Sequence, residues 1–245
     1  MTGRQSVSPV SPRLAGAMGE EDRIREKYAR RKPNDSRYSW FNPGQVFMLQ
    51  ERERRVLELL KQAGVDSLAD TNVLEIGCGQ GAWLRDLIQW GAQPANLTGL
   101  ELLADRAEEA RRLCPAGVKV LCGSASQLEF PADSFDIVLQ STVFTSIQDE
   151  GLKQQVAAEM MRVVRPSGVI LWYDFRFNNP RNPDVTGVGR KEISRLFPGC
   201  KIDLSSITPA PPLVRIMAPW SWLSCHLLGK VPWFRTHYLG VIRKH

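Results

Sequence analysis

The sequence predicts an α/β fold, in which a parallel sheet is covered by helices on both faces. Two observations carry this prediction. Short apolar runs alternate with helical patterns along the middle of the chain, and the runs are apolar throughout, as in strands buried on both faces. The apolar runs lie at 72–76, 96–101, 118–122, 135–140 and 168–175, and the helical patterns at 82–91, 103–113 and 150–164. The length of 245 residues, with 43% hydrophobic and 24% charged residues, suits one large domain with its own core.

Two helices are predicted before the first strand. Residues 1–19 are rich in Ser, Pro, Gly and Ala, a composition typical of a mobile tail. Residues 20–32 alternate charges at helical spacing and predict a short surface helix, which Pro33-Asn34-Asp35-Ser36 ends. The second helix covers 43–64 and ends at Gly64. Its predicted apolar positions are Val46, Leu49, Val56, Leu57 and Leu60.

Further elements are predicted after the fifth strand. A helix over 189–197 precedes a sixth strand over 200–208, and residues 237–242 form the last strand. Between these two strands, one apolar helix face is marked by Ile216, Trp220, Leu223 and Leu227.

The charge distribution and the cysteines narrow the function classes. Residues 190–245 carry nine Lys and Arg against two Asp and Glu, but no RNA or DNA motif accompanies this excess, so nucleic acid is not the expected partner. The five cysteines form no CxxC pair and the three histidines lack partner carboxylates, so neither a disulfide framework nor a metal site is expected. We see no signal peptide, and the apolar stretch at 216–229 is too short to span a bilayer. A reducing cytoplasm fits these features.

The first predicted strand leads into a glycine-rich turn. It reads Val73-Leu74-Glu75-Ile76-Gly77-Cys78-Gly79-Gln80-Gly81 and is followed by a helix from about Ala82. Glycines allow a sharp turn and a close approach to a ligand, and the helix N-terminus favours a polar or anionic group. The next strand ends in Glu101, whose carboxylate can accept both ribose hydroxyls of an adenosine ligand. By itself the turn also satisfies the G-x-G-x-x-G/A pattern of a dinucleotide site.

Four segments in order resemble the class I S-adenosylmethionine (SAM)-dependent methyltransferases, particularly the type 11 group. They are VLEIGCGQG (73–81), TGLE (98–101), GSASQLEFPADSFDIVL (123–139) and EMMRVVRPSGVILWYDF (159–175). A dehydrogenase has no reason to show the last two segments at this spacing. The resemblance implies a Rossmann-like, doubly wound sheet of seven strands, mostly parallel. Its last strand is antiparallel and inserted between the fifth and the sixth.

The resemblance also implies a set of cofactor-binding residues. Gly77, Gly79 and Gly81 are expected under the methionyl part of SAM, with Glu75 near its amine, Glu101 on the ribose, Leu102 in the same pocket, and Gln140 and Ser141 beside the amino acid. The family has Asp after the glycine at position 123, where this chain has Ser124. The adenine is therefore expected to contact the Ala125 N–H or Gln127 instead.

The acceptor is expected at the mouth of the fifth strand, in the stretch LWYDFRFNNPRNP (171–183), because ligands of such sheets bind outside the carboxyl ends of the strands. Asp174 and His237 are candidate bases, with Tyr173 as a further catalytic candidate. The alternative is that Asp174 pairs with Arg176 and that the asparagines form turns, which is favoured for Asn179 and Asn182. The predicted substrate-binding residues are Tyr38, Trp40, Phe144, Arg176 and Asn178.

A segment at 37–45 resembles the lid that often closes over SAM. The aromatic residues Tyr38, Trp40 and Phe41 either shield the sulfonium or anchor the neighbouring helix. The predicted domain boundaries are a flexible, basic segment at 1–35 and a methyltransferase domain at 36–245. The latter comprises the helical lid (36–70), the SAM-binding core (71–175) and an acceptor-side extension (176–245).

The predicted function is methyl transfer from SAM to an oxygen or nitrogen of a small molecule, such as a sugar or a natural-product intermediate, with S-adenosylhomocysteine as product. One alternative is an enzyme that cyclises or cleaves the aminobutyryl chain of SAM and releases methylthioadenosine. Another is a non-catalytic SAM-binding partner. A third is a membrane-surface protein, suggested by Trp220, Trp222, Trp233 and Phe234, although their apolar spacing favours a core-packed helix.

Overall fold

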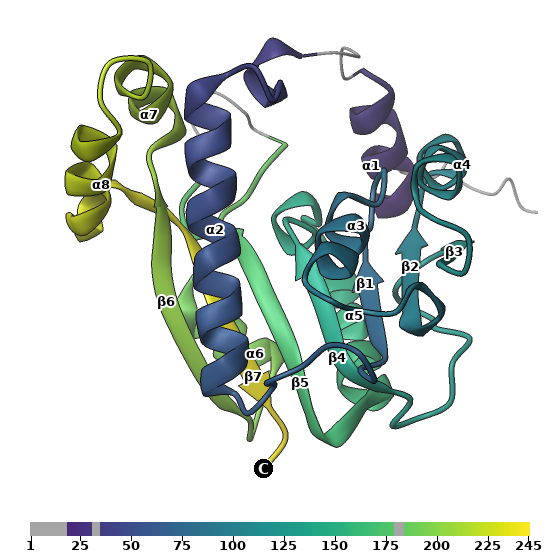
Figure 1. Ribbon diagram of the computed structural model, residues 1–245. Helices are drawn as coiled ribbons and strands as arrows, with labels where there is room; N and C mark the ends of the chain where they lie inside the picture. The colour runs from purple at the N-terminus through teal and green to yellow at the C-terminus, as the bar shows by residue number, and fades with distance from the viewer. Residues whose placement is uncertain (1–18, 31–34, 179–183) are drawn as a thin grey trace, which may run out of the picture.

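Seven strands form a single mixed sheet in the computed structural model, which describes residues 19–30, 35–178 and 184–245 (Figure 1). The strand order is β3-β2-β1-β4-β5-β7-β6, and β7 is antiparallel to both of its neighbours. This confirms the predicted doubly wound fold and the inserted last strand. The strands are β1 (Val73–Ile76), β2 (Leu97–Glu101), β3 (Lys119–Cys122), β4 (Phe135–Ser141), β5 (Val164–Phe175), β6 (Lys201–Pro209) and β7 (Arg235–Arg243).

Helices cover both faces of this sheet. They are α1 (Glu20–Ala29), α2 (Pro43–Gln62), α3 (Ala82–Gln89), α4 (Ala104–Leu113), α5 (Glu150–Val163), α6 (Arg190–Leu196), α7 (Pro211–Met217) and α8 (Trp222–Lys230). Short 3₁₀ turns lie at η1 (Ser36–Tyr38), η2 (Pro94–Asn96), η3 (Phe144–Ser146) and η4 (Pro232–Phe234). In the described parts of the chain, no helix has the length and apolar character that crossing a bilayer requires.

Side-chain alternation along the strands divides the core into two layers. On one face, Trp172 of β5 packs with residues of α5 and α6, including Met160 and Ile193. On the other face, Leu171 packs with residues of α2, α3 and α4, including Leu60 and Leu87. Because both layers are filled, the central strands are apolar on both sides, which explains why their sequences read as continuous apolar runs.

The long helix α2 illustrates how local sequence sets the boundaries. Asn42 caps it by accepting the Gly44 N–H at 3.0 Å, Pro43 begins it, and Gly64 follows it with φ +85°. Its buried apolar residues are Phe47, Met48, Val56 and Leu60. Leu57, which was predicted on this face, is 40% exposed.

Four expectations differ from the structure or lie outside it. The apolar face at 216–227 belongs to two helices, α7 and α8, because Pro219 interrupts it. Strand β5 starts at Val164, four residues before the apolar run. Residues 20–29 are a packed helix with Ile24 in the core, rather than part of a flexible segment at 1–35; the domain boundaries themselves stay a prediction. The calls on residues 1–18, Pro33-Asn34, Asn179 and Asn182 lie outside the described residues.

Candidate functional site

A cavity of ≈ 280 Å³ lies at the carboxyl ends of β1, β2 and β4, where an open α/β sheet binds its ligands. Its floor is the glycine-rich turn with Glu75, and its sides are the ends of β2 and β3 and the loop after β4. Helix α1 contributes Glu21, Ile24 and Tyr28, and α5 contributes Leu152 and Val156. The lining includes the predicted cofactor residues Glu75, Gly77, Gly79, Glu101, Leu102, Ser124, Ala125 and Ser141.

The glycine-rich turn is shaped by left-handed backbone angles. Gly77 and Gly79 have φ +68° and +57°, a region that side-chain-bearing residues rarely adopt. A Cβ on Gly77 would lie 2.6 Å from Val143 Cγ2, so this position needs glycine for space as well as for conformation. Gly81 serves a different purpose, because its missing side chain lets Cys114 pack against the turn, and it does not line the cavity.

Two buried carboxylates face the cavity. Glu101 accepts the Gly79 N–H at 2.7 Å and the Leu103 N–H at 3.1 Å, so it ties the glycine turn to the end of β2. Glu75 is 2% exposed, and no described residue gives its Oε2 a hydrogen bond. Burial raises the pKa of Glu75 well above its ordinary value. An unsatisfied buried acceptor in a cavity wall is the group that a donor on a bound ligand would satisfy.

At position 124, where the family has Asp, three polar side chains from two segments of the chain lie together. Ser124 Oγ donates to the carboxylate of Glu21, which comes from α1, and lies 2.7 Å from Ser126 Oγ. A carboxylate is therefore present beside position 124 although the strand loop itself lacks one. Gln127, the alternative adenine contact, is exposed and does not line the cavity.

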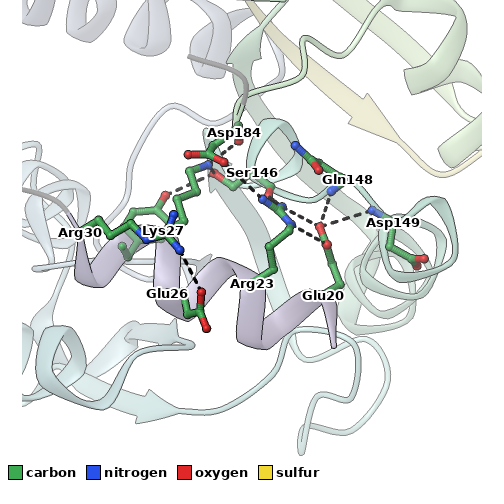
Figure 2. Close-up of polar contacts among 10 residues, drawn as sticks. Glu20, Arg23, Glu26, Lys27, Arg30, Ser146, Gln148, Asp149 and Asp184 are labelled. Carbon is green, nitrogen blue, oxygen red and sulfur yellow. Dashed lines mark hydrogen bonds and ion pairs between the residues drawn. The ribbon is translucent and has the colours of Figure 1, made fainter. Parts of the chain in front are cut away.

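Helix α1 covers the cavity and is attached to it by polar contacts at several points (Figure 2). The Glu20 carboxylate pairs with Arg23 at 2.8 Å and accepts the N–H groups of Gln148 and Asp149. Arg23 donates to the Ser146 carbonyl at 2.7 Å, and Lys27 donates to the Asp184 carbonyl at 2.7 Å. These contacts join α1 to the loop after β4 and to the segment after β5.

The predicted lid at 37–45 does not cover this cavity. Tyr38 and Trp40 are 62% and 68% exposed, and neither is among the lining residues. The helix that closes the cavity is α1 instead. Its residues carried no apolar stripe, only alternating charges, so the sequence indicated a helix without indicating what it covers.

The candidate base Asp174 points away from the cavity, into the layer of α5. It is fully buried, and its oxygens accept the Thr145 N–H at 3.2 Å and the Phe175 N–H at 2.9 Å. Burial raises the pKa of Asp174 to about 7. The alternative ion pair with Arg176 is absent from the described residues. Asp174 therefore anchors the loop after β4, and it does not line the cavity.

His237 and Tyr173 lie on the opposite face of the sheet, and their stacked rings are 4.7 Å apart. Burial lowers the pKa of His237 to about 3, so its ring is neutral at physiological pH. The Tyr173 hydroxyl lies 3.1 Å from Thr208 Oγ1, and burial raises its pKa. Neither residue lines the cavity, but Trp83, which does, lies 6.3 Å from the Tyr173 ring.

The remaining residues that were predicted to bind the substrate or the cofactor contact other parts of the protein. Phe144 is fully buried, with its ring 4.7 Å from that of Trp172, so it belongs to the core. Asn178 accepts the Gly187 N–H at 2.8 Å, as expected for a turn residue. Arg176 lies over the Phe177 ring at 4.3 Å. Gln140 accepts the Val143 N–H at 3.2 Å and is absent from the lining.

Sequence reasoning missed several lining residues. Arg106, whose guanidinium lies 4.8 Å from the Tyr28 ring, and Thr142, with φ +57°, both contribute to the wall. The only feature of the sequence that could have identified Thr142 as a cavity residue is its place as a polar residue just after β4. Among the described residues, no group of three or more His, Cys, Asp or Glu side chains could hold a metal ion.

The chain is similar to known methyltransferases in the same region. A family model described as a methyltransferase domain matches residues 73–168. The tRNA N(3)-cytidine methyltransferase METTL2 of Gallus gallus is 31% identical over 127 residues, which cover 47% of this chain and 34% of that protein. The 2-methyl-6-phytyl-1,4-hydroquinone methyltransferase of Synechocystis sp. is 32% identical over 122 residues, covering 48% and 36%. The fatty-acid O-methyltransferase of Mycolicibacterium smegmatis is 35% identical over 108 residues, covering 42% and 37%.

The fold is also similar to solved structures. A crystal structure of a SAM-dependent methyltransferase from Archaeoglobus fulgidus has a TM-score of 0.55 at 15% identity, over 81% of this chain and 98% of that chain. The segments that match the three sequence relatives span little more than a third of each relative's length.

Residues 73–168 are therefore a methyltransferase domain, and the fold around them is similar to that of the class I SAM-dependent methyltransferases. The cofactor of this class is SAM, which fits two features of the cavity. The Gly77 and Gly79 cradle leaves room that a Cβ would fill, and the Glu75 carboxylate has an unsatisfied oxygen for a ligand donor.

Proposed function

We propose that this protein transfers the methyl group of SAM to a small-molecule acceptor. The observation that carries the proposal is the cavity under α1, in which a glycine turn, an unsatisfied Glu75 oxygen and the Glu101 carboxylate surround one space. Glu75 would accept from the amine, Glu101 would receive the ribose hydroxyls, and Glu21 with Ser124 would meet the adenine amine. These assignments follow the order of β1, β2 and β3 in the sheet, because Glu75 lies on β1, Glu101 on β2 and Ser124 after β3.

SAM supplies an activated methyl group on a sulfonium, which an oxygen or nitrogen nucleophile displaces in line. The protein's contribution to such a step is alignment and exclusion of water. Helix α1 provides the exclusion, because Ile24 and Tyr28 cover the cavity. Neither candidate base lies in the cavity lining. We therefore propose that the acceptor loses its proton to solvent or to a lining carboxylate, rather than to Asp174 or His237.

For the acceptor we propose a small molecule with a substantial apolar part. The expectation of a sugar-type metabolite depended on the polar residues after β5, and Asn178 is engaged with Gly187 instead. Two of the relatives are named for a phytyl hydroquinone and a fatty acid, both largely apolar. The relative named for tRNA favours a different acceptor, a nucleic acid. It is disfavoured by the absence of a nucleic-acid motif and by a cavity with several apolar walls.

The experiment is a methylation screen with SAM that carries a deuterated methyl group. The protein is incubated with a lipid extract, an aqueous metabolite extract or total tRNA, and products are identified by mass spectrometry. We expect a labelled product from the lipid extract, with equivalent S-adenosylhomocysteine. Labelled tRNA alone, or a labelled polar metabolite alone, would contradict the acceptor class. Methylthioadenosine from SAM without any acceptor would contradict methyl transfer itself.

A further inference from the structure

A large apolar surface is exposed at one end of the molecule, outside the cavity. We call it the aromatic surface and define it by residues of α7, α8 and η4 and of the segment before α2. Its members are Tyr38, Trp40, Phe41, Ile216, Trp220, Trp222, Leu223, Leu227, Trp233 and Phe234. Trp220, Trp233 and Phe41 are 89%, 87% and 98% exposed. Exposed apolar residues that gather in this way mark interaction sites on soluble proteins.

The exposed residues of the aromatic surface on α8 lie on the side of the helix that faces away from the core. Helix α8 buries one residue, Cys225, and is attached to α2 through Phe47, whose ring lies 5.6 Å from Trp222 and 4.8 Å from His226. Its outward side carries Leu223 and Leu227, which are 69% and 54% exposed. The expectation of a core-packed helix is therefore wrong for the outward side of α8.

The two parts of the aromatic surface are joined. Helix α7 packs on the start of α2, where Arg215 backbone atoms lie against Gly44, and the Arg215 guanidinium is 6.0 Å from the Tyr38 ring. Figure 1 shows η1, α7 and α1 at the same end of the sheet, so the surface lies at the end of the molecule that holds the cavity.

Cations outnumber acids around this surface. Arg37, Arg215, Lys230 and Arg235 belong to its segments or adjoin them, and residues 204–245 contain no Asp or Glu. The acids beside the surface are Asp35, which pairs with Arg37, and Glu51, which lies near Gly229 of α8. Lys230 is exposed at the end of α8, beside η4. Tryptophans that are flanked by cations are the combination that favours the interface of an anionic lipid bilayer, since the indole rings sit at headgroup depth and the cations meet lipid phosphates.

We propose that the aromatic surface docks this protein on an anionic membrane surface. A second copy of the chain is a poorer occupant, because pairing this surface with itself would bring its excess of cations together. Docking would be peripheral, through side chains that enter the headgroup region. The proposal does not depend on methyl transfer, since it concerns binding alone.

The test is co-flotation of the full chain with vesicles of phosphatidylcholine, alone or with phosphatidylglycerol. We expect flotation with the anionic vesicles, a blue shift of tryptophan emission, and loss of binding at high salt. The double variant Trp220→Ser/Trp233→Ser should reduce vesicle affinity at least tenfold. Both side chains are almost fully exposed, so folding should be retained.

Matched pairs of variants locate the contact. Leu223→Ser on the aromatic surface should weaken binding, whereas Leu113→Ser, at an exposed leucine on α4, should not. Lys230→Glu should weaken binding to anionic vesicles, whereas Lys61→Glu, at an exposed lysine on α2, should have a much smaller effect. SAM-induced thermal stabilisation of every variant serves as the control for an intact cavity.

Three outcomes would overturn the proposal. The first is no flotation with either vesicle. The second is flotation that the Trp220→Ser/Trp233→Ser variant retains in full. The third is a concentration-dependent dimer without vesicles that this variant abolishes, which would identify the surface as a contact between copies. None of these outcomes bears on whether the protein methylates an acceptor.

Discussion

Glu101 both stabilises the glycine turn and faces the cavity. Its carboxylate accepts the N–H groups of Gly79 and Leu103, and it also faces the cavity. Each carboxylate oxygen has two lone pairs, so these bonds leave capacity for ligand hydroxyls. The residue that holds the glycine turn in place is thus also the one proposed to hold the ribose.

The first prediction concerns Glu101. We expect Glu101→Ala to weaken SAM binding by about 1.5–3 kcal/mol, because hydrogen bonds to a charged group are lost and partners are left unpaired. We also expect a lower melting temperature without ligand, because the Gly79 and Leu103 N–H groups lose their acceptor. Isothermal titration calorimetry and thermal unfolding measure the two effects. An unchanged SAM dissociation constant would contradict the ribose assignment.

The second prediction concerns the pH dependence of stability. The pKa of Asp174 is raised from 3.8 to about 7, so between these values the folded protein keeps a proton that the unfolded chain has lost. Stability is therefore lost as pH rises through this window. His237 acts in the opposite direction. Its pKa is lowered from 6.5 to about 3, so stability is lost as pH falls below 6.5.

Asp174→Asn separates these two contributions. Relative to the wild type, the variant should gain stability as pH rises from about 4 to 7, by at most about 1.4 kcal/mol per pH unit, and the difference should level off above pH 7. Urea unfolding at pH 4.5, 5.5, 6.5 and 7.5 measures this difference. Parallel profiles of the two proteins would show that Asp174 is charged in the folded state.

At the scale of elements, α1 is the part that closes the cavity. It has one buried apolar residue, Ile24, so packing contributes little to its position. Polar contacts to Ser146, Gln148, Asp149 and Asp184 hold it instead (Figure 2). A helix that is held mainly by polar contacts at a cavity mouth can open at low cost, which SAM entry requires.

The third prediction compares two arginines of this helical segment. Arg23 joins α1 to the Ser146 carbonyl, whereas Arg30 pairs with Glu26, four residues earlier, and both of these side chains are largely exposed. We expect Arg23→Ala to weaken SAM binding roughly fivefold to tenfold, since a lost charged hydrogen bond of ~1 kcal/mol releases α1. Arg30→Ala should leave binding unchanged. Equal effects of the two substitutions in calorimetry would show that α1 does not close on SAM.

At the scale of the whole molecule, ligand binding and folding are linked. The fourth prediction is that SAM or S-adenosylhomocysteine at 100 times its dissociation constant stabilises the protein by about 2.7 kcal/mol, which raises the melting temperature by roughly 5–10 °C. NAD at the same concentration should produce no shift, because the glycine turn belongs to a methyltransferase domain. Differential scanning fluorimetry measures both. A shift with NAD and none with SAM would contradict the cofactor assignment.

The order of the strands and helices and the position of the glycine turn could be predicted from the sequence. The alternation of apolar runs with helices, the glycine turn after β1 and Glu101 at the end of β2 are local patterns, because strand burial and backbone conformation depend on adjacent residues. The predicted strands therefore match the observed ones within a few residues. The resemblance to the methyltransferases implied the cofactor residues. Most of them line the cavity, Gly81 and Gln140 do not, and their contacts with SAM stay a prediction.

Only the tertiary structure decided which face each remaining side chain occupies. Successive residues of β5 point to opposite faces, so Tyr173 and Asp174 lie in different core layers and away from the cavity, although both end a strand at the ligand edge. The structure likewise placed α1 over the cavity and left Trp220 and Trp233 exposed. These placements depend on contacts between residues far apart in the chain, such as Arg23 with Ser146 and Phe47 with Trp222, which no local pattern encodes.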